Sequence, residues 1–188
     1  MTDTALIDIP HLTPETATGE AADLLADAKA RMGYLPNMYG YMAVLPAILA
    51  GYLSTYDSFR KTAGFTPAEQ ETVFLTVSRV NGCDYCMAAH SMIADKRSGV
   101  APDALAALRA GTAVPDAKLE ALATFTRIMV EKRGSPEKSE IAEFLAAGFT
   151  ENHVLGVVLG IAVKTFSNYV NHLAGTEVDA AFAAYKVA

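Results

Sequence analysis

Both cysteines of the chain lie three positions apart, at Cys83 and Cys86, and His90 follows them by about one helical turn. A helical-looking run upstream carries two carboxylates, Glu69 and Glu71. A thiolate can act as a nucleophile, an imidazole can accept its proton, and a carboxylate can hold the imidazole in one tautomer. No other part of the sequence combines these three kinds of group within the length of one helix.

A helix that starts near Cys83 would present the three groups on one face. A rotation of about 100° per residue places Cys83, Cys86 and His90 within an arc of roughly 60°. A helix N-terminus also favours a thiolate, because its unpaired N–H groups and its dipole stabilise negative charge. This arrangement suits a two-cysteine redox cycle. One thiolate attacks a peroxide or a disulfide, the second thiol closes a Cys83–Cys86 disulfide, and an external reductant reopens it.

Two other interpretations are open for the same residues. Two cysteines, a histidine and a glutamate are also legitimate zinc ligands, although ligands so close together on one helix make tetrahedral closure awkward. Two buried cysteines can also do no more than pack a hydrophobic core. The haem attachment signal is absent, because Met87 rather than a histidine follows Cys86.

Two helices with a short break between them must position these groups. Thr66 is followed by a proline and, three residues on, by Glu69, which is a capping-box pattern and predicts a helix over residues 66–80. Asn81-Gly82 is a strong local break. A second helix is then expected over residues 83–97. The break would let the two helices face each other.

The rest of the chain also reads as helical. Further helices are expected at residues 18–32, 38–44, 46–62, 103–110, 117–132, 136–147 and 150–174, with a short helical turn at residues 179–186. Residues 1–17 form an expected extended arm, since Pro10 and Pro14 block a helix. No strand pattern stands out. We therefore expect one all-α domain over residues 1–188, folded as a compact helical bundle.

Several other side chains are of kinds found in functional sites, but the sequence does not show where they point. An aromatic and aliphatic stripe that includes Tyr52 and Tyr56 can form a substrate wall, but core or subunit interface is the favoured interpretation. Lys164 can stabilise a thiolate or a carboxylate, although nothing in the sequence fixes where it points. His153 and His172 lie near opposite ends of the last predicted helix, where structural roles are favoured.

The composition limits the class of protein, its main partners and its expected location. The 188 residues are 52% hydrophobic and 19% charged, as in globular proteins. The net charge of −6 argues against nucleic acid or an anionic membrane surface as the main partner. The N-terminus lacks a basic region followed by an apolar one, and the longest apolar run, Val154–Val163, is too short to cross a bilayer. We expect a soluble cytoplasmic protein that forms a homo-oligomer.

The residues around the cysteines also resemble a known signature. Glu71 followed by Cys83-x-Tyr85-Cys86-x-x-x-His90, with Gly99 beyond, is similar to the carboxymuconolactone decarboxylase superfamily in its alkylhydroperoxidase D-like branch. The resemblance is specific over about residues 65–100. Two further segments are similar to the peroxidase-related members of that branch, namely Leu35-Pro36-Asn37 and Asn168-Tyr169-x-Asn171-His172.

The resemblance implies roles for individual residues. Cys86 matches the thiol that attacks the peroxide and Cys83 the thiol that resolves it, while His90 and Glu71 match the proton relay. It implies an all-helical fold, assembly as trimers or hexamers, and neither a metal nor an organic cofactor. The substrate would be a hydroperoxide, and the electrons would come from a dithiol partner such as a lipoylated or thioredoxin-like protein.

One position departs from the signature. Some peroxidase members carry a second histidine between the cysteines, where this chain has Tyr85. A phenol with a pKa of about 10 is a poorer proton relay at neutral pH. The alternatives are a decarboxylase-type activity on a ring acid, although such enzymes generally lack the cysteine pair, and a non-enzymatic redox-sensing module.

Overall fold

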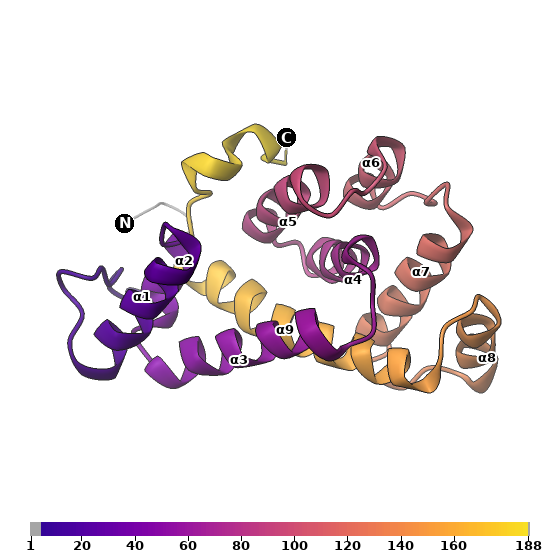
Figure 1. Ribbon diagram of the computed structural model, residues 1–188, viewed down its shortest axis with the longest axis horizontal. Helices are drawn as coiled ribbons and strands as arrows, with labels where there is room; N and C mark the ends of the chain where they lie inside the picture. Colours follow the sequence, from indigo (N-terminus) through magenta and orange to yellow (C-terminus); the bar gives the residue numbers. More distant parts are fainter. Residues whose placement is uncertain (1–4, 188) are drawn as a thin grey trace.

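The computed structural model describes residues 5–187, in which every regular element is a helix (Figure 1). The elements are α1 (Gly19–Met32), α2 (Asn37–Met42), α3 (Pro46–Thr62), α4 (Pro67–Val80), α5 (Asp84–Lys96), α6 (Pro102–Ala110), α7 (Ala117–Glu131), α8 (Lys138–Ala146), α9 (Glu151–Ala174) and a terminal 3-10 helix, η1 (Ala180–Tyr185). The predicted all-α fold class is confirmed. The predicted helix boundaries agree with these bounds to within two residues.

Helix α4 is the central element of the fold. It packs against α5, α6, α7 and α9, and Figure 1 shows it in the middle of the molecule. Residues 69–78 are buried without a break, so this helix has no solvent-facing side over that length. Its start is fixed by the predicted capping box, because Thr66 and Glu69 each accept a hydrogen bond from the other's backbone N–H.

Helix α9 approaches its neighbours closely at two glycines. A Cβ at Gly160 would lie 2.6 Å from Val73 Cγ1 and 2.9 Å from Phe59 Cε2. A Cβ at Gly156 would lie 2.8 Å from Phe65 Cε2. Real Cβ atoms do not approach so closely, so only glycine lets α9 lie against α3 and α4 at this separation. This close packing determines how far the α9 side chains reach into the space between α3 and α5.

Within residues 5–187, α9 is also the one helix whose length and composition would allow it to cross a membrane. The expectation drawn from the sequence considered only the shorter apolar run inside it. A core helix of a soluble protein meets the same criterion. In the fold α9 packs against α2, α3, α4, α5 and α7, which is the environment of a core helix.

Both ends of the described chain return to the helical body. Residues 5–18 contain no helix, as expected for the arm, and the backbone N–H of Leu6 donates to the carbonyl of Leu173 at 2.8 Å. After α9 the chain crosses back so that η1 packs on α5 (Figure 1). Arg109 holds this segment by donating to the carbonyls of Tyr185 at 3.0 Å and Lys186 at 3.2 Å.

Gly160→Ala should destabilise the fold. Its new methyl group meets Val73 and Phe59 at distances that force α9 outward, and overpacking of this kind costs about 1–3 kcal/mol. Gly51→Ala is the matched control, because its Cβ would meet only Phe166 at an ordinary 3.4 Å while alanine favours the helix. Urea unfolding measures both. Equal stability of Gly160→Ala and wild type would contradict the close packing of α9.

Candidate active site

Both cysteines lie at the start of α5, just after a tight turn. Gly82 adopts a φ of 69°, a left-handed conformation that glycine reaches without strain, and the chain reverses there from α4 to α5. Cys83 is the N-cap residue of α5 and Cys86 lies in its first turn. Both are free thiols and both are buried, with 1% and 2% of their surface exposed. Asn81 fixes the turn by donating to Asn168 Oδ1 at 2.9 Å.

His90 and Glu71 meet across the interface between α5 and α4. His90 Nδ1 lies 2.8 Å from Glu71 Oε2, and the other carboxylate oxygen lies 2.5 Å from Arg60 Nη1. Glu71 is fully buried, so two cationic or polar neighbours replace the water that its charge would otherwise need. Glu69, the other candidate carboxylate, instead pairs with Lys118 at 2.8 Å and caps α4.

The charges of this group favour a neutral histidine beside an ionised carboxylate. Burial on its own would raise the pKa of Glu71, but His90 and Arg60 outweigh it and the pKa lies below its usual value. Burial, followed by the positive charge of Lys164, lowers the pKa of His90 despite the opposing effect of Glu71. A carboxylate only accepts hydrogen bonds, so Nδ1 must carry the proton and Nε2 the lone pair. Nε2 is therefore available as a base.

The pKa values of the two thiols are shifted in opposite directions. Burial on its own would raise the pKa of Cys86, but a hydrogen bond from Cys83 and the positive charge of Lys164 outweigh it, so the pKa lies well below its usual value. The hydrogen bond to Cys86, followed by burial, raises the pKa of Cys83. The side-chain amide of Asn171 also faces both sulfurs, with Nδ2 3.3 Å from Cys86 Sγ and 3.8 Å from Cys83 Sγ. The arrangement favours Cys86 as the thiolate.

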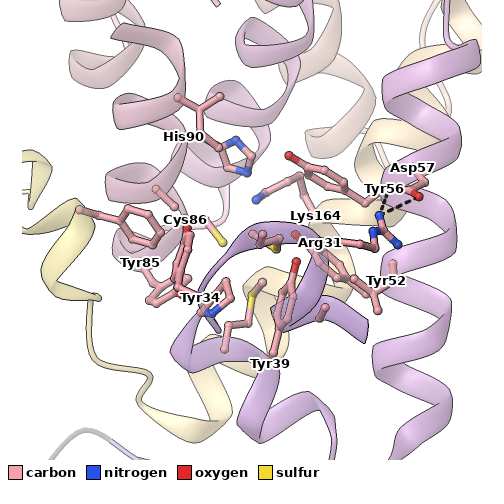
Figure 2. Close-up of a pocket in the computed structure, with 18 of the residues that line it drawn as sticks. Arg31, Tyr34, Tyr39, Tyr52, Tyr56, Asp57, Tyr85, Cys86, His90 and Lys164 are labelled. Carbon is pink, nitrogen blue, oxygen red and sulfur yellow. Dashed lines mark hydrogen bonds and ion pairs between the residues drawn. The ribbon is translucent and has the colours of Figure 1, made fainter. Parts of the chain in front are cut away.

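A cavity of about 250 Å³ opens beside Cys86. Cys86, His90 and Lys164 line one end of it and face one another in Figure 2. Aromatic rings supply much of the remaining wall, from Tyr34, Tyr39, Tyr52, Tyr56, Tyr85 and Phe182. Tyr52 belongs to the hydrophobic core and Tyr56 packs against it, which confirms the favoured interpretation of their stripe as core, and both rings also line the cavity.

Tyr85 serves to hold the C-terminal segment. Its hydroxyl donates to Asp179 Oδ2 at 2.5 Å, and the other oxygen of that carboxylate accepts the backbone N–H of Asn37 at 3.0 Å. Burial, followed by the negative Asp179, raises the pKa of Tyr85. A phenol held in this way stays protonated near neutral pH. The η1 residue Phe182 packs edge-on against the Tyr85 ring and covers the cavity.

The structure brings the four sequence-predicted site residues into one neighbourhood and adds three others. Arg60 from α3, and Lys164 and Asn171 from α9, were not assigned to the site from the sequence. Lys164 and Asn171 lie seven residues apart, so they share a helix face. The sequence offered the cationic type of Lys164 and the resemblance of the segment around Asn171 as signals, but neither fixed a direction. His153, by contrast, accepts the backbone N–H of Thr150 at 3.1 Å and caps α9. Among residues 5–187, no group of three or more His, Cys, Asp or Glu side chains is arranged to hold a metal ion.

A comparison with models of protein families finds one that matches part of this chain. The model described as "Carboxymuconolactone decarboxylase family" matches residues 46–131, which run from α3 to α7 and contain both cysteines, His90 and Glu71. The match covers a little under half of the chain, so the likeness to this family is confined to those residues. A comparison with curated protein sequences finds no significant match.

Solved structures share the fold of nearly the whole chain. The alkylhydroperoxidase AhpD core of a peroxidase-related protein from Ralstonia eutropha JMP134 matches with a TM-score of 0.80, 18% identity and 93% coverage of both chains. A peroxidase-related protein from Silicibacter sp. TM1040 has a TM-score of 0.77, 19% identity and coverage of 96% of this chain and 95% of that one. A variant of the debrominase Bmp8 in complex with 2,3,4-tribromopyrrole has a TM-score of 0.71, 17% identity and 87% coverage of both chains. The fold is that of the alkylhydroperoxidase D-like branch.

Lys164→Met should raise the pKa of Cys86, because it removes a positive charge that stabilises the thiolate while keeping a side chain of similar length. A pH titration of thiolate ultraviolet absorbance in the reduced protein measures the change. Lys138→Met, at the exposed start of α8, is the control and should leave the titration unchanged. A folded Lys164→Met protein with the wild-type titration would show that Lys164 does not act on the sulfur.

Proposed function

We propose that this chain is a thiol-dependent peroxidase or disulfide oxidoreductase that reduces hydroperoxides through Cys86 and Cys83, with His90 and Glu71 as the proton relay. The observation that carries the proposal is the position of Cys86. Its sulfur has a lowered pKa and lines a cavity that it shares with the base His90. The peroxidase-related proteins of the same fold add support at the level of the general activity.

In the proposed first step, the Cys86 thiol loses its proton to His90 Nε2. The thiolate then attacks the distal oxygen of the hydroperoxide, so that an S–O bond forms and the O–O bond breaks. The alkoxide leaves as an alcohol after it takes the proton from His90. Glu71 stabilises the transient imidazolium through Nδ1, and Arg60 keeps Glu71 charged.

In the second step, Cys83 attacks the sulfenic acid on Cys86. An S–S bond forms, the S–O bond breaks, and hydroxide leaves as water with the proton from Cys83. The cycle so far converts one hydroperoxide and two thiols into an alcohol, water and a disulfide. A dithiol partner, lipoylated or thioredoxin-like, returns two electrons and two protons and becomes a disulfide itself. None of these steps requires a metal or an organic cofactor bound to this chain.

A second candidate activity is reductive removal of a halogen from an aromatic ring. The aromatic wall around Cys86 favours it, and the debrominase Bmp8 of the same fold has been solved with a brominated pyrrole. The balance is similar, since two thiols and an aryl halide give the dehalogenated ring, the hydrogen halide and a disulfide. Release of bromide from a bromopyrrole by the reduced protein would identify this activity. A decarboxylase-type reaction on a ring acid and a non-enzymatic redox sensor remain the alternatives drawn from the sequence.

We further propose that the protein works as a cytoplasmic homo-oligomer, a trimer or a hexamer. Exposed apolar side chains on α9 support self-association, namely Leu155, Val158, Tyr169 and Leu173. Such residues exposed along one helix are a common feature of subunit contacts.

Cys86→Ser should abolish hydroperoxide consumption, because serine has no nucleophilic thiolate at neutral pH. Cys83→Ser should keep a single rapid turnover and then stop with a sulfenic acid on Cys86 that dimedone traps. Stopped-flow peroxide assays and mass spectrometry measure both. If wild type consumes hydroperoxide no faster than Cys86→Ser, the peroxidase proposal is wrong, and the redox-sensor alternative gains support.

Glu71→Gln should lower the rate constant for hydroperoxide reduction about a hundredfold, the usual scale for losing general acid–base help. In wild type the rate should fall as the pH drops through the lowered pKa of Cys86, because the protonated thiol is a poor nucleophile. Glu69→Gln is the matched control, a carboxylate two residues away that pairs with Lys118 instead. Similar losses in the two variants would argue against a specific relay through Glu71.

A further inference from the structure

The cavity beside Cys86 is much larger than hydrogen peroxide requires. Its volume is about 250 Å³. An apolar protein cavity of about 150 Å³ holds one benzene molecule. If the volume per heavy atom is the same, this cavity holds about ten heavy atoms, which is a six-membered ring with about four more. The size of the cavity therefore favours an organic substrate that contains a ring.

The cavity wall suits a flat aromatic molecule. Tyr39, Tyr52 and Tyr56 form a continuous series of rings, with centroids 5.9 Å and 5.7 Å apart, and aromatic ligands pack well on such surfaces. The hydroxyls of Tyr34, Tyr39 and Tyr52 form no hydrogen bond to another residue within the described range 5–187. Those hydroxyls are free to donate to polar atoms on a ligand.

The charges around the cavity leave one cation uncompensated. Arg31 pairs with Asp57 at 2.9 Å, and the Lys164 ammonium faces the Cys86 thiolate. Arg97 also lines the cavity, and it forms no ion pair with any residue of the described chain. An unpaired guanidinium beside a ligand cavity favours an anionic group, all the more so in a protein whose net charge is −6.

Cys86 lies in the first turn of α5, and Arg97 is the residue that follows its last turn. His90 and Ile93 lie between them on the same face and also line the space. A rise of 1.5 Å per residue separates the two ends by about 16 Å along the helix axis. The arginine side chain spans part of that length, which leaves room for one ring between its guanidinium and the sulfur.

Building on the proposed peroxidase function, we propose that the oxidising substrate is an aromatic hydroperoxide that carries an anionic group. Its peroxide lies at Cys86 and His90, its ring lies among the tyrosines, and its anionic group faces Arg97. Reduction follows the balanced cycle given above and yields the corresponding aromatic alcohol. Hydrogen peroxide fills only a fraction of this cavity and contacts neither Arg97 nor the tyrosine series.

Calorimetry with the reduced wild-type protein tests the ligand class without any redox reaction. Benzoate should bind at least about tenfold more tightly than acetate, which lacks the ring, and more tightly than benzamide, which lacks the charge. Arg97→Gln should weaken benzoate about threefold to tenfold and leave benzamide unchanged. Arg127→Gln, outside the cavity on α7, is the control. Equal binding of benzoate and acetate, or an unchanged preference for benzoate in Arg97→Gln, would overturn the inference.

Kinetics separate this inference from the proposed function. Wild type should reduce a ring-carboxylated cumene hydroperoxide with a higher kcat/KM than cumene hydroperoxide, and cumene hydroperoxide with a higher kcat/KM than hydrogen peroxide. If benzoate binds selectively but no hydroperoxide is reduced, the peroxidase function fails and the aromatic anion site stands. If hydrogen peroxide reacts as fast as the aromatic peroxides and benzoate does not bind, the function stands and the substrate class is wrong.

Discussion

A single buried carboxylate, that of Glu71, constrains most of the site. It lies in the fully enclosed part of α4, where an unpaired charge would cost several kcal/mol. Arg60 of α3 and His90 of α5 each engage one of its oxygens. One ion-pair network thus links α3, α4 and α5. The same network fixes the orientation of the His90 ring. The capping box at Thr66 fixes where α4 begins and so where that carboxylate lies.

Helix α9 supplies the complementary half of the site. The glycines that face α3 and α4 let it approach until Lys164 is 1% exposed and the Asn171 amide reaches the sulfur of Cys86. Lys164 forms no ion pair with a carboxylate within the described chain. Its ammonium lies 5.4 Å from the centre of the Phe74 ring, and its charge acts on the Cys86 thiolate. Packing between apolar surfaces therefore sets the electrostatics of the thiol pair.

Local signals explain what the sequence could predict. The capping box, the Asn81-Gly82 break and the spacing from Cys83 to His90 are short-range features, and the helix pair and the fold class follow from them. The contributions of Arg60 and Lys164 depend on which helix faces lie against α4 and α5, and a single sequence contains no pairing information of that kind. Periodicity also cannot show that a ring packed in the core lines a cavity on its other side, as the Tyr52 ring does.

The surroundings of Cys86 have a consequence for the energetics of electron transfer. The hydrogen bonds from Cys83 and Asn171 and the charge of Lys164 stabilise the reduced form, because they act on a thiolate. Closing the disulfide removes that negative charge and leaves the Lys164 ammonium buried without its anion. Stabilising the dithiol relative to the disulfide raises the reduction potential of the pair, as in strongly oxidising disulfide catalysts. The oxidised protein would then accept electrons readily from a weakly reducing dithiol.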